Sequence, residues 1–178
     1  MRHFLFALTL LLVLPLAIAQ GYKPKAGESV VKVEVAGRGD IYIRVATKDA
    51  PRTAARFIEL VKGGFYDGQR FHRVERSPRP YLAQIGDPAS KNSVDSAGNG
   101  GSGRKIDFEE SKLSNGEGAV GFAHPENDRN GGDSQFYILL GPAKFLDGSY
   151  TVFGQVVDGM DVVKKLSRGD RVVSVKVM

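Results

Sequence analysis

The chain contains no cysteine. This absence excludes disulfide bonds, thiol catalysis and cysteine-ligated metal sites. It suits an oxidising compartment, because no thiol can mispair there. Histidine is also scarce: His72 and His124 are the only two beyond the N-terminal stretch, and neither stands in a metal-ligand spacing such as HxxxH. We therefore predict neither a metal nor another cofactor.

Motifs of hydrolases and nucleotide-binding proteins are missing as well. No GxSxG nucleophile motif occurs, and no spacing singles out a catalytic pair of carboxylates. The segment Gly98–Lys105 approaches a phosphate-binding loop, but Arg104 stands where lysine is required and no apolar strand precedes it. We predict a surface loop there.

Positive charge is not concentrated anywhere in the chain. The formal net charge is +5, but the basic residues are scattered and form no block of five or six. A nucleic-acid-binding surface requires a clustered basic patch or stripe. We therefore expect no nucleic-acid partner, and a nucleic-acid binder, which would show a steeply salt-dependent affinity, is the weakest alternative.

Long apolar runs are absent except at the N-terminus. Arg2 and His3 provide a basic start, and Phe4–Ala19 is continuously apolar and ends in a small-x-small pattern before Gln20. This pattern predicts a Sec-type signal peptide, residues 1–19, and export to a periplasm or out of the cell. The run is short for a membrane-spanning helix, so we expect no stable membrane insertion after cleavage, with an uncleaved anchor as the alternative.

The rest of the chain is predicted to form a single domain. Residues 20–28 are polar and contain glycine and proline, which is typical of a linker. Residues 29–178 then have the length and composition of one globular, turn-rich domain that can bury a core without disulfides.

Alternating and helical patterns indicate a mainly β fold with two helices. Ser29–Val35 and Ile41–Val45 alternate apolar and polar residues, as the strands of a hairpin do. A helix is predicted next, with Asp49 as its N-cap, Pro51 in its first turn and Gly63 at its end. The remaining predicted elements are strands at Gln69–Val74, Tyr81–Gly86, Ala119–His124, Ser134–Leu140, Tyr150–Val157 and Arg171–Val177, and a short helix within Gly159–Asp170. Such a set favours a closed or sandwiched antiparallel sheet, and periodicity does not choose between them.

Five motifs in a fixed order give a more specific indication. They are "APRTAARFIELVKGGFYDGQRFHRV" (Ala50–Val74), "AQIGD" (Ala83–Asp87), "GFAH" (Gly121–His124), "DSQFYI" (Asp133–Ile138) and "FLDGSYTVFGQVVDGMDVV" (Phe145–Val163). In this order the chain resembles the cyclophilin-type peptidyl-prolyl cis-trans isomerases from about Val31 to its C-terminus. The resemblance implies a closed eight-stranded antiparallel β-barrel capped by two α-helices. It also implies a monomeric enzyme that rotates X–Pro bonds of proline-containing polypeptides and assists the folding of exported proteins.

The same resemblance assigns the site residues. It implies that Arg73 is the main catalytic residue and that Gln84 lies beside it. The residues implied to bind substrate are Tyr81, Leu82, Phe122, Ala123, His124, Gln135, Tyr137, Phe145, Leu146 and Tyr150.

Several of these positions depart from the best-known members of the family. Phe145 replaces a tryptophan that is associated with cyclosporin binding. Tyr81 and Tyr137 replace phenylalanines and add hydroxyl groups to an apolar pocket. Tyr150 replaces a histidine, and His124 replaces an asparagine that contacts the peptide backbone.

A second class of function follows from these substitutions. A cyclophilin-like domain with an altered pocket could bind proline-containing segments as a chaperone or scaffold without much turnover. Retention of Arg73 and Gln84 argues for the enzyme instead. The segment Glu75–Pro80 is also longer than the corresponding connection in the family, which leaves the position of Tyr81 for a structure to decide.

Overall fold

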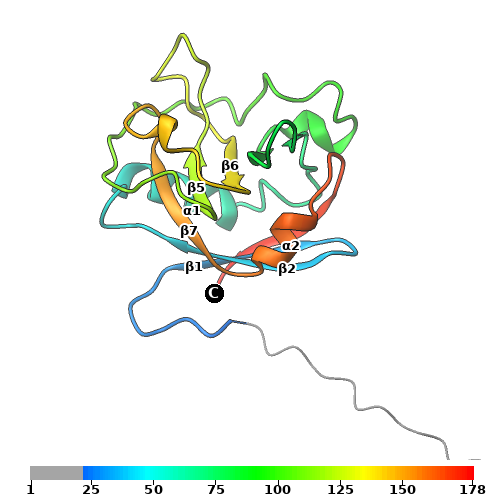
Figure 1. Ribbon diagram of the computed structural model, residues 1–178, viewed down its shortest axis with the longest axis horizontal. Coiled ribbons are helices and arrows are strands. Elements are labelled where there is room, and N and C mark those ends of the chain that lie inside the picture. Colours follow the sequence, from blue (N-terminus) through cyan, green and yellow to red (C-terminus); the bar gives the residue numbers. More distant parts are fainter. Residues whose placement is uncertain (1–21) are drawn as a thin grey trace, which may run out of the picture.

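The computed structural model describes residues 22–178, which form eight strands and two α-helices (Figure 1). The strands are β1 (Val30–Val35), β2 (Gly39–Val45), β3 (Arg73–Glu75), β4 (Leu82–Ile85), β5 (Ala119–Phe122), β6 (Phe136–Leu139), β7 (Val152–Asp158) and β8 (Val172–Val177). The helices are α1 (Pro51–Lys62) and α2 (Met160–Lys165), with 3-10 turns at Pro88–Lys91 and Lys144–Leu146. Every strand and α-helix predicted from the sequence is present, most of them with tighter bounds. The predicted signal peptide lies outside the described residues.

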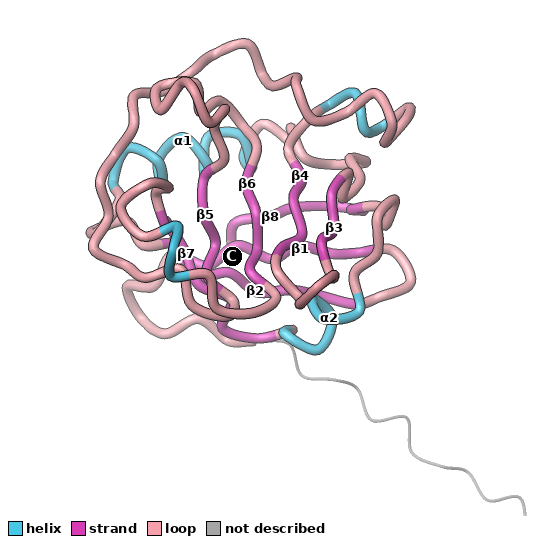
Figure 2. Tube along the Cα trace, turned by 45° about the horizontal axis from the view of Figure 1, so that its top comes forward, coloured by secondary structure: helices cyan, strands magenta, loops and turns pink. Residues whose placement is uncertain are grey.

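All eight strands join one antiparallel sheet in the order β3-β4-β6-β5-β7-β2-β1-β8. The sheet curls into a half-barrel, in which β5, β6, β4 and β3 run across the direction of β8 (Figure 2). The predicted closed barrel is wrong, because the end strands β3 and β8 do not pair. Between the segments that precede them, Arg70 and Arg171 form an isolated bridge.

At each of the two edges, a side chain satisfies one backbone group. Asp67 Oδ1 accepts a hydrogen bond from Val175 N in β8 at 2.8 Å. Near β3, Arg168 Nε donates to the backbone oxygen of His72 at 2.9 Å. A sheet edge that is blunted in this way does not need a neighbouring strand to satisfy its polar groups. In the described part of the chain, backbone hydrogen bonds join the two edges only beside the Arg70–Arg171 bridge, between residues 68–71 and 169–172.

The interior of the half-barrel holds the larger apolar cluster, which we call the core cluster. Helix α1 inserts Phe57 between rings from the sheet, with ring-centre distances of 5.2 Å to Phe136 and 5.0 Å to Phe153. Tyr66, just beyond the helix, lies 5.6 Å from Phe57, and its hydroxyl donates to the backbone oxygen of Ser134. Such aromatic rings contribute much of the apolar area that folding buries.

The start of α1 differs from its prediction. Asp49 does not cap the helix: the N-cap is Ala50, whose side chain offers no acceptor. The carboxylate of Glu109 takes this role from a distant loop and accepts hydrogen bonds from Arg52 N at 3.1 Å and Thr53 N at 2.8 Å. The first turn of a helix has unpaired N–H groups, so a buried carboxylate stabilises it.

Part of the predicted linker is attached to the domain. The ring of Tyr22 lies 6.0 Å from that of Tyr42 in β2, and its hydroxyl donates to Glu28 at 2.8 Å.

Within residues 22–178, no helix combines the length and the apolar character that a bilayer crossing demands.

Candidate active site

The register of the sheet aligns three predicted site residues in one row. Arg73 in β3 is opposite Gln84 in β4, Gln84 is opposite Tyr137 in β6, and Tyr137 is opposite Gly121 in β5. Directly opposed residues of antiparallel strands project from the same face of the sheet. Arg73, Gln84 and Tyr137 therefore share the outer face of the half-barrel, away from the core cluster.

A chain of hydrogen bonds fixes the polar side of this row. Arg73 Nη1 donates to Gln84 Oε1 at 3.4 Å, and Gln84 Nε2 donates to Gln135 Oε1 at 2.8 Å. Gln135 Nε2 in turn donates to the backbone oxygens of Gly98 at 3.0 Å and Gly100 at 2.8 Å. Because a carbonyl can only accept, both amide groups have a single orientation that satisfies every member of the chain. Gln84 therefore presents its oxygen to Arg73.

The glycine-rich loop that resembled a phosphate site has a structural role in this chain. Asp87 is buried and accepts hydrogen bonds from the backbone nitrogens of Ala89 at 2.9 Å, Gly98 at 2.7 Å and Gly100 at 2.7 Å. Burial acts to raise the pKa of Asp87, but these three N–H groups outweigh it and hold the pKa below its ordinary value. The ionised carboxylate thus fixes the two carbonyls that orient Gln135.

The guanidinium of Arg73 is held at two points and half exposed. Its Nε donates to Glu75 Oε1 at 3.1 Å, and its Nη1 donates to Gln84. Its side chain retains 49% of its accessible surface. Arginine carries five N–H donors in a rigid fork, so donors remain for a substrate after these two bonds.

An apolar surface lies next to this arginine. We call it the pocket cluster: Leu82, Ala119, Tyr137, Leu139, Ala143, Leu146 and Val152, with Tyr81, Leu113, Ala123 and Tyr150 packed against it. Six of the predicted substrate-binding residues belong to this set. Phe145 completes the rim, with its ring centre 5.7 Å from that of Tyr81 and a residue exposure of 63%.

The hydroxyl of Tyr137 does not stand free in this apolar environment. It donates to Asn115 Oδ1 at 2.7 Å, and Asn115 Nδ2 donates to Asp147 Oδ1 at 2.9 Å. Burial raises the pKa of Tyr137, which keeps the phenol neutral. Asn115 and Asp147 are not among the predicted site residues. The signal that could have pointed to them is the tyrosine in place of phenylalanine, because a buried hydroxyl needs a hydrogen-bond partner.

His124 lies at the other end of the site. Its ring stacks on Tyr150 with a centre distance of 4.4 Å and an interplanar angle of 16°. Its two nitrogens lie 2.8 Å from the backbone oxygen of Pro125 and 2.9 Å from that of Ser149. A cavity of about 330 Å³ lies beside it and reaches Gln84 and the glycine-rich loop.

One predicted site residue is placed elsewhere. Phe122 is buried in the core cluster, with its ring 5.9 Å from that of Phe153. Successive residues of a strand face opposite sides of the sheet, so Phe122 points inward while its neighbour Gly121 faces Tyr137 on the outside. The structure therefore does not bring Phe122 together with the other predicted site residues.

The longer segment after β3 leaves Tyr81 at the pocket. Tyr81 N donates to the backbone oxygen of Glu75 at 2.9 Å. This bond joins the two ends of the longer loop. Arg76 Nη2 donates to the backbone oxygens of Lys164 at 2.7 Å and Leu166 at 2.6 Å, at the end of α2. These contacts hold the added residues at the rim of the site, where Arg79 lies 5.9 Å from the ring centre of Phe145.

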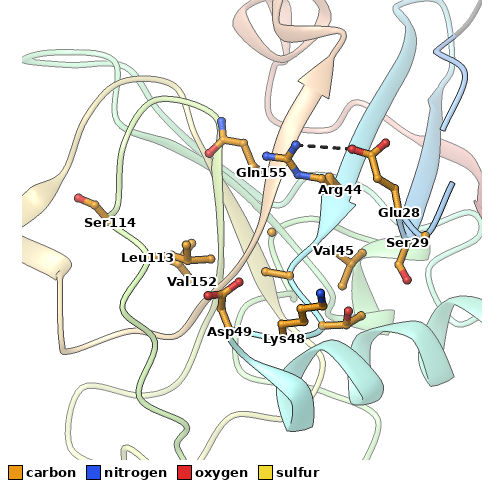
Figure 3. Close-up of a pocket in the computed structure, with 14 residues that line it drawn as sticks. Glu28, Ser29, Arg44, Val45, Lys48, Asp49, Leu113, Ser114, Val152 and Gln155 are labelled. Carbon is orange, nitrogen blue, oxygen red and sulfur yellow. Dashed lines mark ion pairs between the residues drawn. The ribbon is translucent and has the colours of Figure 1, made fainter. Parts of the chain in front are cut away.

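A larger cavity lies apart from these residues (Figure 3). It has a volume of about 450 Å³ and lies between β2, β7 and the segment around Leu113. Glu28 and Arg44 form an ion pair of 3.7 Å at its border. It contains none of the predicted site residues, so size alone does not identify the site in this molecule.

Comparison with known proteins agrees with the fold and identifies the family. The family model described as cyclophilin type peptidyl-prolyl cis-trans isomerase/CLD matches residues 30–177. A peptidyl-prolyl cis-trans isomerase of Synechococcus elongatus is 39% identical over 143 residues, covering 79% of this chain and 91% of that protein. One of Helicobacter pylori is 35% identical over 142 residues, covering 78% and 80%. The chain belongs to the cyclophilin-type peptidyl-prolyl cis-trans isomerase family.

Solved structures share the fold at lower sequence identity. A cyclophilin of Hirschia baltica aligns with a TM-score of 0.68 and 24% identity, covering 83% of this chain and 73% of that one. A cyclophilin-type isomerase of Cryptosporidium parvum aligns with a TM-score of 0.70 and 21% identity, covering 85% and 98%. The predicted family and the predicted enzyme class are confirmed: the protein is an isomerase of peptidyl-prolyl bonds, and its substrates are proline-containing peptides.

Proposed function

We propose that this isomerase assists the folding of exported proteins, in a periplasm or outside the cell, and that Arg73 is its catalytic donor. The observation that carries the proposal is the fixed chain from the glycine-rich loop through Gln135 and Gln84 to Arg73, next to the pocket cluster. We further propose that the protein works as a monomer, since the proposed site needs no group from a second copy.

The reaction needs no nucleophile and no proton transfer. Rotation about an amide faces a barrier of about 18–20 kcal/mol, because the nitrogen shares its lone pair with the carbonyl. Bringing an exchange that takes roughly tens to hundreds of seconds to an ordinary turnover requires about 5–7 kcal/mol of transition-state stabilisation. This demand is lower than that of most enzymes, which fits a site without nucleophilic or metal chemistry.

Arg73 has the properties that the twisted transition state requires. As the amide twists, the proline nitrogen regains its lone pair and accepts a hydrogen bond that it cannot accept in the planar ground state. A charge-assisted hydrogen bond contributes about 1.5–3 kcal/mol. Gln84 and Glu75 hold the guanidinium before substrate arrives, which reduces the ordering cost at the moment of reaction.

The pocket cluster would supply the remainder. Leu82 and Leu146 are nearly buried and form an apolar floor, while Tyr81 and the exposed Phe145 form a wall. A proline ring that binds here leaves water and brings its nitrogen towards Arg73, where desolvation strengthens the hydrogen bond.

Replacing Arg73 tests the assignment. Arg73→Ala is expected to lower kcat/KM for an X–Pro peptide about 10- to 100-fold, the equivalent of one charge-assisted hydrogen bond. Arg73→Lys keeps the charge but not the planar fork and is expected to recover only part of the rate. Lys176→Ala removes an exposed cation on β8 and serves as the matched control. Nearly full activity of Arg73→Ala, measured by exchange spectroscopy, would overturn the assignment.

The same measurement separates the enzyme from the binding module. A module that only holds proline segments slows the exchange or leaves it unchanged, whereas an isomerase accelerates it at substoichiometric concentration. The pocket substitutions are the only ground for a module, whereas the family and the oriented Arg73–Gln84 pair favour turnover.

Export has its support in the sequence. The basic start, the apolar run and the small-x-small pattern before Gln20 support cleavage after Ala19, and a chain without cysteine tolerates oxidising surroundings. Fractionation of the producing cells followed by mass measurement of the intact protein tests the proposal. A mature form that begins at Gln20 outside the cytoplasm is expected, and a full-length cytoplasmic form would contradict it.

A further inference from the structure

The segment that lengthens the connection after β3 lines a cavity together with three residues of the site, Arg73, Tyr81 and Phe145. Its volume is about 250 Å³, and its lining residues are Arg73, Glu75, Ser77, Pro78, Arg79, Tyr81 and Phe145. The cavity next to His124 reaches Gln84, whereas this one reaches Arg73. The two cavities thus adjoin different members of the Arg73–Gln84 pair, as subsites for residues that flank a bound proline would.

The walls of this cavity are anchored. Arg76 fastens one end of the loop to the C-terminus of α2, and the backbone bond between Tyr81 and Glu75 closes the other. Within the loop, the guanidinium carbon of Arg79 lies 5.9 Å from the ring centre of Phe145. A cation near an aromatic face is attracted to the ring, so Phe145 holds Arg79 in the lining of the cavity.

The charges in the cavity do not balance. Two guanidinium groups, those of Arg73 and Arg79, line it together with one carboxylate, that of Glu75. Glu75 is already paired with Arg73 at 3.1 Å. Among residues 22–178, Arg79 has neither an ion-pair partner nor a side-chain hydrogen bond, so its charge is available to a ligand.

We propose that this cavity is a subsite for an acidic side chain of the client, one or two residues away from the proline. The proposal rests on the proposed function, in which Arg73 receives the X–Pro bond. A carboxylate there would pair with Arg79 over the face of Phe145. A lysine at the same position would meet two like charges. Such a preference would come from Arg79 in the added segment, at a subsite that adjoins the proline pocket and shares Arg73, Tyr81 and Phe145 with it.

The subsite is tested with peptides that contain an Ala-Pro pair. Each peptide carries Glu, Gln, Leu or Lys at one position, one or two residues before or after that pair. Kd is measured on the purified protein by chemical-shift titration, and exchange rates are measured with the same peptides. At one of the positions the Glu peptide is expected to bind about two- to fivefold more tightly than the Gln peptide at low salt, as for an exposed ion pair. This ratio is expected to fall towards one as the ionic strength rises.

Variants at Arg79 assign the effect to this side chain. Arg79→Ala is expected to abolish the preference for Glu, Arg79→Lys to keep part of it, and Arg79→Glu to shift it towards Lys. Lys176→Glu makes the same change of charge on β8 and is expected to leave the ratio unchanged. Equal Kd values for Glu and Gln peptides at every position would overturn the proposal. So would a preference that survives Arg79→Ala, or a Leu peptide that binds best.

The design separates the two proposals. Exchange of the neutral Gln peptide by wild type reports the proposed function alone, and the ratio of Kd values reports the subsite. If the neutral peptide is not isomerised, the proposed function fails and the Kd ratio still decides the subsite. If it is isomerised and the ratio equals one, only the subsite fails.

Discussion

The two apolar clusters of this protein contain similar residues but differ in how far their outermost side chains are exposed to solvent. In the core cluster, Phe57 meets the rings of Tyr66, Phe136 and Phe153, and all four side chains are buried. The pocket cluster ends in Phe145, which is largely exposed, and the hydroxyl of its Tyr137 is bound to a buried amide. Closed packing contributes to stability, whereas apolar surface left open beside a fixed donor is what a substrate needs. Mutations in the first cluster should therefore change folding, and mutations around the second should change activity.

The largest effect is expected from the core cluster. Phe57→Ala removes a fully buried ring on which three others pack, and the free energy of unfolding is expected to fall by about 3–5 kcal/mol. Denaturant unfolding followed by circular dichroism measures it. The matched control is Phe145→Ala, which removes the same side chain from an exposed position and is expected to cost less than about 1 kcal/mol. Similar losses for both variants would break the distinction between the clusters.

Tyr137→Phe is expected to lower stability less than Phe57→Ala does. It tests the distinction between the two clusters in a second way. The change leaves the side-chain oxygen of Asn115 buried without a donor, which costs about 1–3 kcal/mol of unfolding free energy. The isomerase rate per folded molecule should stay close to wild type, because the hydroxyl faces away from Arg73 towards Asn115. A large loss of kcat without a loss of stability would show instead that the hydroxyl takes part in substrate binding.

Glu109 gives a pH-dependent contribution outside both clusters. Burial acts to raise its pKa, but hydrogen bonds from Thr53 N and Arg52 N outweigh it and lower the pKa below the ordinary 4.5. A group whose pKa is lower in the folded state stabilises the fold above its unfolded pKa, and this stabilisation is lost as the pH falls through the folded pKa. Glu109→Gln is expected to be less stable by about 0.5–2 kcal/mol at neutral pH.

The control for Glu109 is the pH profile itself. The stability difference between wild type and Glu109→Gln is expected to shrink as the pH falls below about 4.5, since the wild-type carboxyl then becomes protonated. Unfolding midpoints measured between neutral and acidic pH would show this. A difference that is constant over the whole range would contradict the role of the charge.

The smallest predicted effect lies in the polar chain next to the pocket cluster. Gln135→Ala removes the acceptor that orients Gln84, so Gln84 can rotate and present its amide nitrogen to Arg73. A loss of about 0.5–1.5 kcal/mol in transition-state stabilisation, roughly 2- to 12-fold in kcat/KM, is expected. A change confined to KM would indicate that Gln135 contacts substrate rather than positioning Gln84.

Local sequence patterns and the family motifs predicted the secondary structure and the central pair of the site. Alternation located the first two strands, short apolar segments between turns located the other six, and the motifs selected Arg73 and Gln84, which the register places opposite each other. The same period of two, applied to Gly121 and its neighbour, would have assigned Phe122 to the interior. The resemblance alone placed Phe122 in the site, and a motif match does not say which face of the strand a residue occupies.

What the sequence did not predict depends on contacts between distant segments. Glu109 is more than fifty positions from the helix that it caps, and the partner of Tyr137 lies in a separate loop. Whether the sheet closes depends on how its two end strands approach each other in space, which no local pattern encodes. The cavity at Arg79 depends on where an unusually long connection is anchored.

The lack of space at Gly121 has a consequence for how this enzyme can diverge. The ring of Tyr137 occupies the position that a side chain on Gly121 would need. A larger residue at Gly121 in β5 would therefore require a smaller residue at Tyr137 in β6. An increase in size at this contact would have to pass through paired substitutions, so we expect specificity to change more readily at the pocket rim, where Phe145 and Arg79 are exposed.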